Sequence, residues 1–446
     1  MSKPRIVLPA SDVNVDADVP IRLAGFRPDS QVELRASFTD HDGATWRSHA
    51  VFATDWLGSV DVMTARPLSG TWDEAHGHGL FWSMSPGPPD EYEAFKRAGR
   101  PADEAGPGGH RMGLPGLRGD APLRVDFTAI SDGKQAAAAS LVRHRFPPNV
   151  REIVVHEGRV RGRVFQPESA DGLPGVVMIA GSGGGIGRER AALMAAHGFS
   201  VFALGYFSFD DLPTHQVRIP LEYFREAFHW FREHLGHDRI GLTGGSKGGE
   251  GTLVVATAWP DLVKAAVPVV PGDLYLCAAN EKGERHAAWT LGGEDLPWAG
   301  TPADWARIPP EHQAPKPGEL FNTRLNMEAF YAAPDVHARA AIPVERMACP
   351  ILLIWAGDDQ AWPSQLAVER LLRRLDEHDY SHPYRDLTVE GAGHFCIETG
   401  YPTVMADTVL HPLLPIYMTM GGAPEPTARL QREAWQARIR FFRDVL

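Results

Sequence analysis

The stretch RIGLTGGSKGGEGTLVVATA (residues 239–258) places a single serine, Ser246, between two pairs of glycines. The residues before the serine form an apolar run typical of a buried strand, and residues 249–260 are predicted to form a helix. Glycine has no Cβ, so the chain beside the serine can turn sharply from strand to helix. The stretch therefore predicts a serine on a tight turn at a helix N-terminus, rather than in a flexible loop.

The five residues from Gly244 to Gly248 match the pattern G-x-S-x-G, the nucleophile elbow of α/β-hydrolases. A chain with 45 glycines produces this pattern easily by chance, so its position between an apolar strand and an apolar helix is the stronger signal. The positive end of the helix would favour the negative charge of a tetrahedral intermediate. We therefore predict that Ser246 is a catalytic nucleophile.

The same alternation of apolar strands and helices extends outward from this stretch. Strands are predicted at 175–181, 200–207, 239–245, 265–270 and 350–357, and helices at 188–198, 221–236 and 249–260. Such alternation indicates a mostly parallel sheet with helices on both faces. We predict an α/β-hydrolase catalytic domain over residues 146–446. Its residues around 273–345 have weak periodicity and are predicted to be a cap-like insertion over the carboxyl ends of the strands.

The first part of the chain, residues 1–145, has a different pattern. Short apolar runs with a period of two alternate with turn residues, which predicts a β-sandwich of immunoglobulin-like shape, here without a cysteine pair. Residues 86–121 are rich in glycine, proline and charge, and are predicted to be an exposed loop or insertion.

A serine nucleophile needs a base and an acid that follow it in the order Ser, Asp or Glu, His. Among 19 histidines, His394 has the most suitable setting, because it follows a predicted strand and a Gly-Ala-Gly turn. Two acids, Asp358 and Asp359, follow the strand at 350–357. We favour Asp359, because a tryptophan and a proline then follow at the usual distance; Asp358 is the alternative.

An oxyanion hole requires two backbone N–H groups. We predict one from Lys247, the residue after the nucleophile, and one from Gly183 in the loop after the strand at 175–181, with Ser182 and Gly184 as alternatives. A phosphate-binding loop is the rival interpretation. No frame of GSGGGIGRER, which starts at residue 181, fits G-x-G-x-x-G.

Two charged residues after the serine have simple interpretations. The Lys247 side chain is either a functional cation or a surface lysine at the start of a helix, and the sequence leaves both open. Glu250 in the first helical turn is explained by the positive end of the helix dipole.

Composition limits the partners. The formal net charge of −12 gives no support to nucleic-acid binding. Cys277, Cys349 and Cys396 form no CxxC pair, so we predict no metal and no cofactor. With no signal peptide and no apolar run long enough for a bilayer, we expect no membrane association and a cytoplasmic protein.

These residues occur in a familiar combination. The chain resembles the acyl-CoA thioesterase / bile acid-CoA:amino acid N-acyltransferase (BAAT) family over nearly its whole length, in the motifs GLFWSMSP, IGLTGGSKGGE, IPVERMACPILLIWAGDDQAW and GAGH. The resemblance implies an N-terminal β-sandwich followed by an α/β-hydrolase domain. It also implies a catalytic triad of Ser246, Asp359 and His394.

The resemblance implies acyl transfer through a covalent serine ester, with an acyl-CoA or another acyl thioester as substrate. Hydrolysis to a free acid and CoA is favoured, because the family's amino acid N-acyltransferases typically have a cysteine nucleophile. Amino acid N-acylation remains an alternative, as does a carboxylic ester or lactone hydrolase with the same triad. A binding protein without catalytic activity is a further alternative, which the complete set of predicted catalytic residues disfavours. The sequence indicates neither the acyl group nor the oligomeric state.

Overall fold

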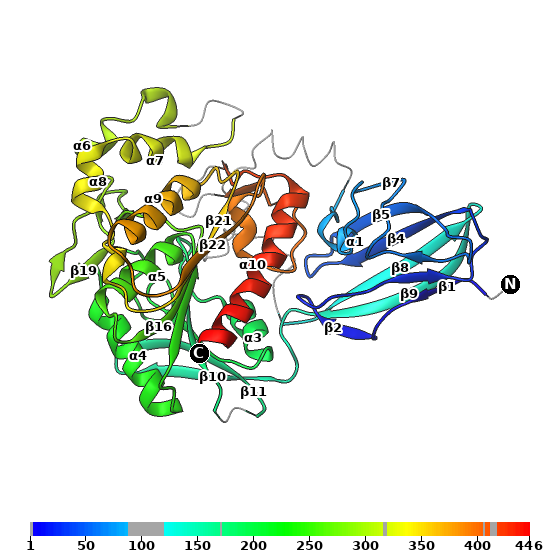
Figure 1. The fold of residues 1–446 in the computed structure, drawn as a ribbon, viewed down its shortest axis with the longest axis horizontal. Helices are drawn as coiled ribbons and strands as arrows, with labels where there is room; N and C mark the ends of the chain where they lie inside the picture. Colours follow the sequence, from blue (N-terminus) through cyan, green and yellow to red (C-terminus); the bar gives the residue numbers. More distant parts are fainter. Residues whose placement is uncertain (1–2, 88–119, 170–171, 315–318, 405, 411–416) are drawn as a thin grey trace.

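The computed structural model describes residues 3–87, 120–169, 172–314, 319–404, 406–410 and 417–446 (Figure 1). The loop predicted at 86–121 lies almost entirely outside the described residues. Among the helices of the described residues, none has both the length and the apolar character needed to cross a membrane.

The N-terminal part is a sandwich of a six-stranded and a three-stranded sheet, with strand orders β2-β9-β8-β4-β5-β7 and β1-β3-β6. In β4, alternate side chains are buried, as expected for a strand with one face in a core. The elements are β1 Arg5–Val7, β2 Asp12–Asn14, β3 Arg22–Ala24, β4 Gln31–Thr39, β5 Thr45–Ala53, β6 Val60–Asp61, β7 Ser69–Gly70, the short helix α1 Gly79–Trp82, β8 Leu123–Ser131 and β9 Lys134–His144.

The C-terminal part is built on an eight-stranded sheet with the order β10-β11-β13-β12-β15-β16-β21-β22. Its strands are β10 Val150–Glu157, β11 Val160–Pro167, β12 Gly175–Ile179, β13 Ser200–Gly205, β15 Ile240–Gly245, β16 Val263–Val269, β21 Ile351–Ala356 and β22 Tyr384–Val389. Only β11 pairs antiparallel with both of its neighbours, and the pairs from β13 to β22 are parallel. The predicted α/β-hydrolase fold with a mostly parallel sheet is therefore confirmed.

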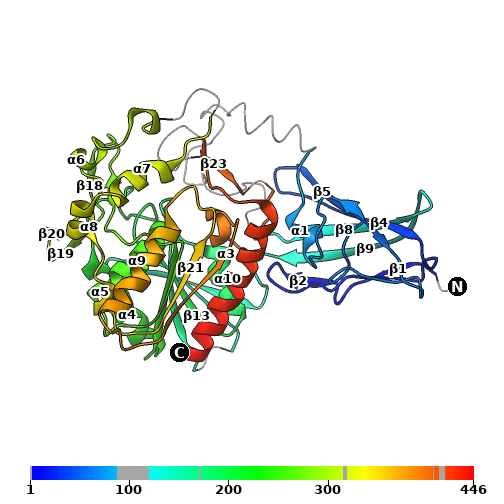
Figure 2. The same ribbon diagram turned by 45° about the horizontal axis from the view of Figure 1, so that its top comes forward.

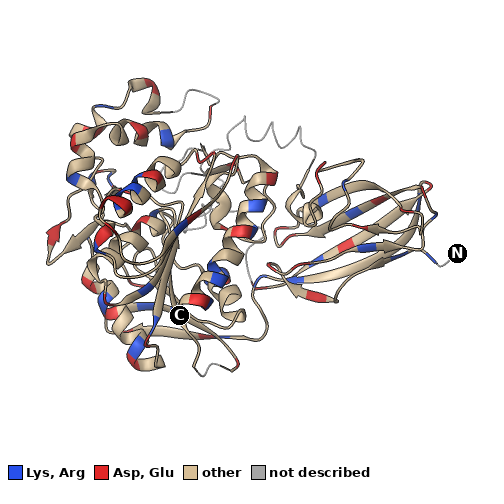
Figure 3. Ribbon diagram, in the orientation of Figure 1, with Lys and Arg blue, Asp and Glu red and all other residues tan. Residues whose placement is uncertain are grey.

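Helices cover both faces of this sheet. The helices α4 Leu221–Leu235, α5 Lys247–Ala258 and α9 Ser364–Glu377 pack on one face, and α3 Arg188–Ala196 and α10 Pro424–Val445 on the other. The predicted helices correspond to α3, α4 and α5, whereas α9 and α10 had not been predicted. Basic and acidic residues both occur along α4, α9 and α10 (Figure 3).

The chain between β16 and β21 forms a layer of short elements near the carboxyl ends of the strands (Figure 2). We name residues 273–345, without 315–318, the cover segment. It contains β17 Cys277–Ala279, β18 Arg285–Ala287, β19 Trp289–Leu291, β20 Glu294–Asp295, α6 Pro302–Trp305, α7 Thr323–Tyr331 and α8 Pro334–Ala340. Strand β19 also pairs with β14 Ile219–Pro220, and outside the segment β23 Thr408–Leu410 pairs with β24 Tyr417–Thr419.

The sandwich lies beside α10 and is joined to the C-terminal part by buried polar contacts (Figures 1 and 2). The Asp16 carboxylate accepts hydrogen bonds from Trp435 Nε1 at 2.8 Å and pairs with His197 Nε2 at 2.6 Å. The Arg145 guanidinium lies 3.6 Å from the centre of the Tyr401 ring. The two parts therefore pack together through groups from both, rather than being joined by the connecting chain alone.

Candidate active site

Ser246 occupies the turn between β15 and α5 in a backbone conformation that is rare for residues other than glycine. Its φ is 58° and its ψ is −123°, and its side chain is only 2% exposed. Its N–H group donates to the carbonyl oxygen of Val269 at 2.9 Å, which attaches the turn to the neighbouring strand β16. Helix α5 begins at the next residue, two residues earlier than predicted, so the serine stands at the helix N-terminus.

The glycines around Ser246 allow the backbone of the turn to pack closely. A Cβ on Gly244 would lie 2.4 Å from the carbonyl oxygen of Gly248, and one on Gly248 would lie 2.6 Å from that of Ala180. Both distances are shorter than any normal contact, so a side chain at either position would push strand and helix apart. The paired glycines are thus needed for a tight turn, as the sequence predicted.

His394 and Asp359 form a buried pair at the same edge of the sheet. His394 follows β22, Asp359 follows β21, and both side chains are almost inaccessible. His394 Nδ1 lies 2.8 Å from Asp359 Oδ2, while Asp359 Oδ1 accepts the N–H groups of Ala361 and Trp362 at 3.0 and 2.9 Å. These bonds fix the carboxylate and leave His394 Nε2 as the nitrogen available for proton transfer.

Two neighbours hold the imidazole in place. The Trp362 ring stacks on that of His394 with 6.4 Å between the ring centres and 6° between their planes. The backbone before the histidine is tightly packed, because a Cβ on Gly393 would lie 2.0 Å from the carbonyl oxygen of Gly421. The Gly-Ala-Gly turn that drew attention to His394 in the sequence therefore has a steric reason.

Asp358, the alternative acid, has other partners. Its carboxylate accepts hydrogen bonds from Gln360 Nε2 at 2.5 Å and from the N–H group of Gly422 at 3.0 Å. Asp358 therefore ties its own loop to the segment that precedes α10. Of the two aspartates, the structure brings Asp359 to the histidine.

The loop after β12 offers N–H groups near the turn. Gly184 N–H donates to the carbonyl oxygen of Gly181, and Gly185 N–H donates to that of Phe207. The N–H groups of Ser182, Gly183 and Lys247 have no acceptor among the described residues. Gly183 and Lys247 thus keep a free N–H group for a ligand. Ser182 remains an alternative donor, whereas Gly184 is excluded because its N–H group is already bonded to Gly181.

The Lys247 side chain differs from its interpretation as a surface lysine, because it is buried. Its ammonium donates to both carboxylate oxygens of Glu250, at 2.8 and 2.6 Å, and to the carbonyl oxygen of Leu276 at 3.1 Å. Glu250 is fully buried, so an interaction with the helix dipole does not account for it. The two residues form an internal ion pair directly after Ser246.

Glu250 also connects the turn to the cover segment. Its Oε1 accepts hydrogen bonds from the Leu276 N–H group at 3.1 Å and from Trp289 Nε1 at 2.8 Å. Burial raises the pKa of the Glu250 carboxyl, while Lys247 and these donors act in the opposite direction. Sequence reasoning missed this ion pair. The available signal was the spacing of three residues between opposite charges inside an otherwise apolar helix.

A cavity of about 810 Å³ adjoins the turn. Gly183 and Lys247 line it, as does Trp362, whereas Ser246 itself is not among the lining residues. Much of the remaining wall comes from the cover segment, including Cys277. Burial raises the pKa of the Cys277 thiol. The cavity is large enough for a substrate of moderate size beside the predicted catalytic groups.

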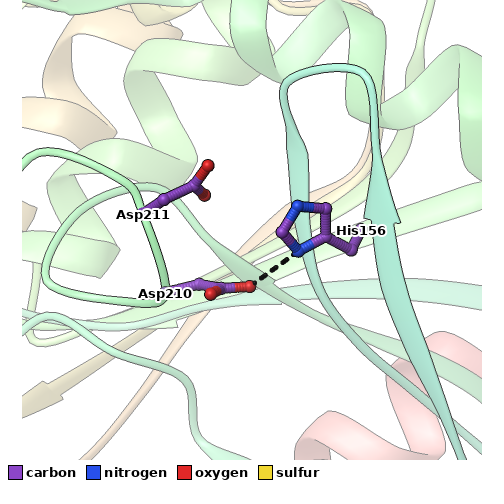
Figure 4. A group of neighbouring side chains, drawn as sticks. All are labelled: His156, Asp210 and Asp211. Atoms are coloured by element: carbon purple, nitrogen blue, oxygen red, sulfur yellow. Dashed lines mark hydrogen bonds and ion pairs between the residues drawn. The ribbon is translucent and has the colours of Figure 1, made fainter.

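One group of described residues could offer three metal-ligand atoms, and it lies elsewhere. His156, Asp210 and Asp211 have ligand atoms within 4.8 Å of one another on an exposed surface (Figure 4). The Arg161 guanidinium binds both oxygens of Asp211, at 2.5 and 2.9 Å, and keeps the pKa of that carboxyl below its usual range. Because arginine already neutralises this carboxylate, we assign no metal to the group.

Comparison with protein families gives two matches. The family described as "BAAT / Acyl-CoA thioester hydrolase C terminal" matches residues 219–446, and the one described as "Acyl-CoA thioester hydrolase/BAAT N-terminal region" matches residues 16–105. The first match spans about half of the chain and contains Ser246, Asp359 and His394.

Curated relatives are similar over almost the whole chain. Acyl-coenzyme A thioesterase 1 of Homo sapiens is 31% identical over 99% of this chain and 96% of its own length. Acyl-coenzyme A thioesterase 1 of Mus musculus is 30% identical over 97% of this chain and 94% of its own. A peroxisomal succinyl-coenzyme A thioesterase of Mus musculus is 29% identical, with 96% and 93% covered.

Proposed function

Because the chain is a hydrolase enzyme of the acyl-CoA thioester hydrolase/BAAT family, we propose that it hydrolyses an acyl-CoA to a free acid and CoA. The reaction runs through an ester on Ser246. The observation that carries this proposal is the buried pair of His394 and Asp359, with 2.8 Å between Nδ1 and Oδ2, at the edge of the sheet where the serine turn also lies.

In the first half of the reaction, Ser246 Oγ attacks the thioester carbonyl carbon while its proton passes to His394 Nε2. Asp359 stabilises the imidazolium that forms. The carbonyl oxygen becomes an oxyanion that accepts hydrogen bonds from the N–H groups of Lys247 and Gly183. The C–S bond then breaks, and the CoA thiolate takes the proton from the imidazolium.

In the second half, a water molecule replaces CoA. His394 Nε2 removes a proton from the water as its oxygen attacks the acyl carbon, and the same N–H groups hold the new oxyanion. The ester bond breaks, Ser246 recovers its proton from the imidazolium, and the acid is released. The steps need no cofactor, since His394 supplies every proton transfer.

Rapid CoA release from a panel of short, medium, long and aromatic acyl-CoAs tests the proposal. We expect turnover by the wild-type enzyme and its loss in Ser246→Ala, while glycine or taurine leave the rate and the product unchanged. The matched control is Ser182→Ala, which keeps the backbone N–H groups of the loop. Equal turnover by wild type and Ser246→Ala would contradict the role of the serine.

The same assay separates the alternatives. An amide product with glycine or taurine would assign the enzyme to the amino acid N-acyltransferases, although a serine ester is a poorer acyl donor to amines than the thioester of a cysteine enzyme. Turnover of carboxylic esters or lactones, but of no CoA thioester, would keep the catalytic residues and change the substrate. Thioesters of an acyl carrier protein are a third set of substrates for the same turnover assay.

A further inference from the structure

Asn326 is a buried polar residue that the proposed mechanism does not use. Its side chain is 3% exposed, and its Oδ1 has no hydrogen-bond partner among the described residues. A buried amide oxygen without a partner destabilises the folded protein, because it loses its hydrogen bonds to water and gains none. Such an atom in a native fold needs an explanation, and a bound ligand is one.

The position of Asn326 provides a reason. It lines the same 810 Å³ cavity as Gly183 and Lys247, the two predicted oxyanion donors. It lies on α7, whose first turn is bonded to the loop of the predicted acid. Thr323 Oγ1 donates to the carbonyl oxygen of Ala361 at 2.8 Å, and an Arg324 nitrogen donates to that of Asp359 at 3.1 Å. Asn326 thus lies three residues, about 4.5 Å along the helix axis, beyond Thr323.

The cavity wall contributed by α7 and its neighbours is largely apolar, although Thr323 and Gln313 also line it. Met327 and Phe330 of the same helix line the cavity, as do Phe321 and Trp362. A carboxamide offers both a donor and an acceptor, so it pairs best with a ligand group that also has both. In apolar surroundings such a pair discriminates strongly against ligands that lack the matching group.

We propose that Asn326 is a specificity residue, whose carboxamide binds a hydrogen-bonding group of the substrate within a few bonds of the thioester. The inference rests on the proposed thioesterase function and narrows its substrate class. Two parts of an acyl-CoA could supply the group. One is the amide nearest to sulfur in the thiol arm, and the other is a hydroxyl group on the acyl chain.

The test compares wild type, Asn326→Leu and the control Met327→Leu, which alters the neighbouring lining residue without removing a polar group. The substrates are a straight-chain acyl-CoA, the N-acetylcysteamine and S-propyl thioesters of the same acid, 3-hydroxyacyl-CoA and succinyl-CoA. The ratio of wild-type to variant kcat/KM for each substrate cancels the intrinsic reactivity of the thioester.

We expect Asn326→Leu to lower kcat/KM about tenfold for substrates with the recognised group and less than about twofold for the others. Losses with CoA and N-acetylcysteamine thioesters, but not with the S-propyl thioester, identify the amide of the thiol arm. A loss confined to 3-hydroxyacyl-CoA identifies the acyl chain, and in that case succinyl-CoA, whose ionised carboxylate cannot donate to Oδ1, should show less than about a twofold loss. Met327→Leu should show no such selectivity.

An equal loss with all substrates, or no loss with any, would overturn the role of Asn326. The thermal midpoint gives a second reading, since removal of an unpartnered amide should leave Tm unchanged or raise it, whereas a structural role predicts a lower Tm. Wild-type turnover reports separately on the thioesterase proposal. If wild type hydrolyses no thioester, the thioesterase proposal fails. Calorimetric binding of CoA to wild type and to Asn326→Leu then still tests the contact with the thiol arm. Equal CoA affinities of the two proteins would count against that contact.

Discussion

The turn that carries Ser246 and the cover segment face the same cavity, but they are built differently. From Lys247 to Thr257, all side chains of α5 are buried, and the glycines before the helix leave no room even for a Cβ. The cover segment consists of strands of two or three residues and short helices, and its Asn326, Met327 and Phe330 line the cavity. Under the two proposals above, the sheet side fixes atoms for chemistry and the cover side offers groups for recognition.

If this division holds, changes on the sheet side should cost the most activity. Asp359→Asn removes the charge that orients His394, and we expect kcat to fall by about 10⁴-fold, because the asparagine favours the wrong imidazole tautomer. The matched change Asp358→Asn alters an aspartate that binds Gln360 and Gly422 instead. Steady-state kinetics of both variants on one acyl-CoA make the comparison, and an equal loss in the two would assign the acid role to neither alone.

The Lys247–Glu250 ion pair connects the turn of Ser246 to the cover segment, and a substitution can break this connection. Glu250→Gln leaves the buried Lys247 ammonium without its counter-charge, and we expect the free energy of unfolding to fall by about 3 kcal/mol. Urea unfolding of the single variant and of the double variant Lys247→Met with Glu250→Leu measures the effect. The double variant should recover more than half of the loss, because it leaves no isolated charge. A wild-type unfolding midpoint for Glu250→Gln would show that the pair contributes little.

A cysteine on the cover side gives an effect that depends on pH. N-ethylmaleimide should modify Cys277, which is partly exposed, before the buried Cys349 and Cys396, and lower kcat/KM on the order of tenfold by filling the cavity. The thiolate is the reactive form, and burial raises the pKa of the Cys277 thiol. The rate of inactivation should therefore be below that of free cysteine at pH 7 and still increase at pH 9. Cys277→Ser should be resistant; inactivation of that variant at the same rate would exclude Cys277.

The smallest effect is expected where the cover segment meets solvent. The Arg285 guanidinium lies 3.6 Å from the centre of the Trp305 ring, and both residues line the cavity. We expect Arg285→Ala to raise KM for an acyl-CoA about threefold with little change in kcat, since an exposed cation contributes weakly to binding. Arg385→Ala, which removes a guanidinium near the Phe441 ring outside the cavity lining, is the control. Equal KM values for wild type and Arg285→Ala would remove Arg285 from substrate binding.

The same two sides differ in how well the sequence predicts them. Apolar runs and glycine pairs are local signals, and they gave the order of strands and helices around Ser246 and drew attention to Gly393 before His394. The roles of Lys247 and Glu250 depend on Leu276 and Trp289, which lie far along the chain. Their burial was therefore not visible in the local pattern.

The cover segment was predicted only as an insertion with weak periodicity. Asn326 has no local signal, because an asparagine on a short helix is usually exposed, and only the assembled cavity shows that it is buried without a partner. The missed helix α10 is a different case. Its amphipathic pattern, with Leu430, Ala434 and Ile439 buried on one face, was present in the sequence but was not used.

The cover segment leaves the sheet after β16 and returns at β21, and these two strands are hydrogen-bonded neighbours. Because these strands are parallel, the exit and return points lie at opposite ends of them, and the ends of the segment are instead joined by a hydrogen bond from the Ile342 N–H group to the carbonyl oxygen of Asp273, at 2.9 Å. With its ends held in this way, a longer or shorter insertion changes the loop-closure entropy only slightly. The start of the segment is more constrained than its interior, since Glu250 accepts a hydrogen bond from the N–H group of Leu276 near the point where the chain leaves the sheet. A chimera that exchanges this segment must therefore keep Leu276, Trp289 and the first turn of α7, because these bond to Glu250 and to the loop of Asp359. The parts of the insertion between them are suited to replacement without rebuilding the turn of Ser246.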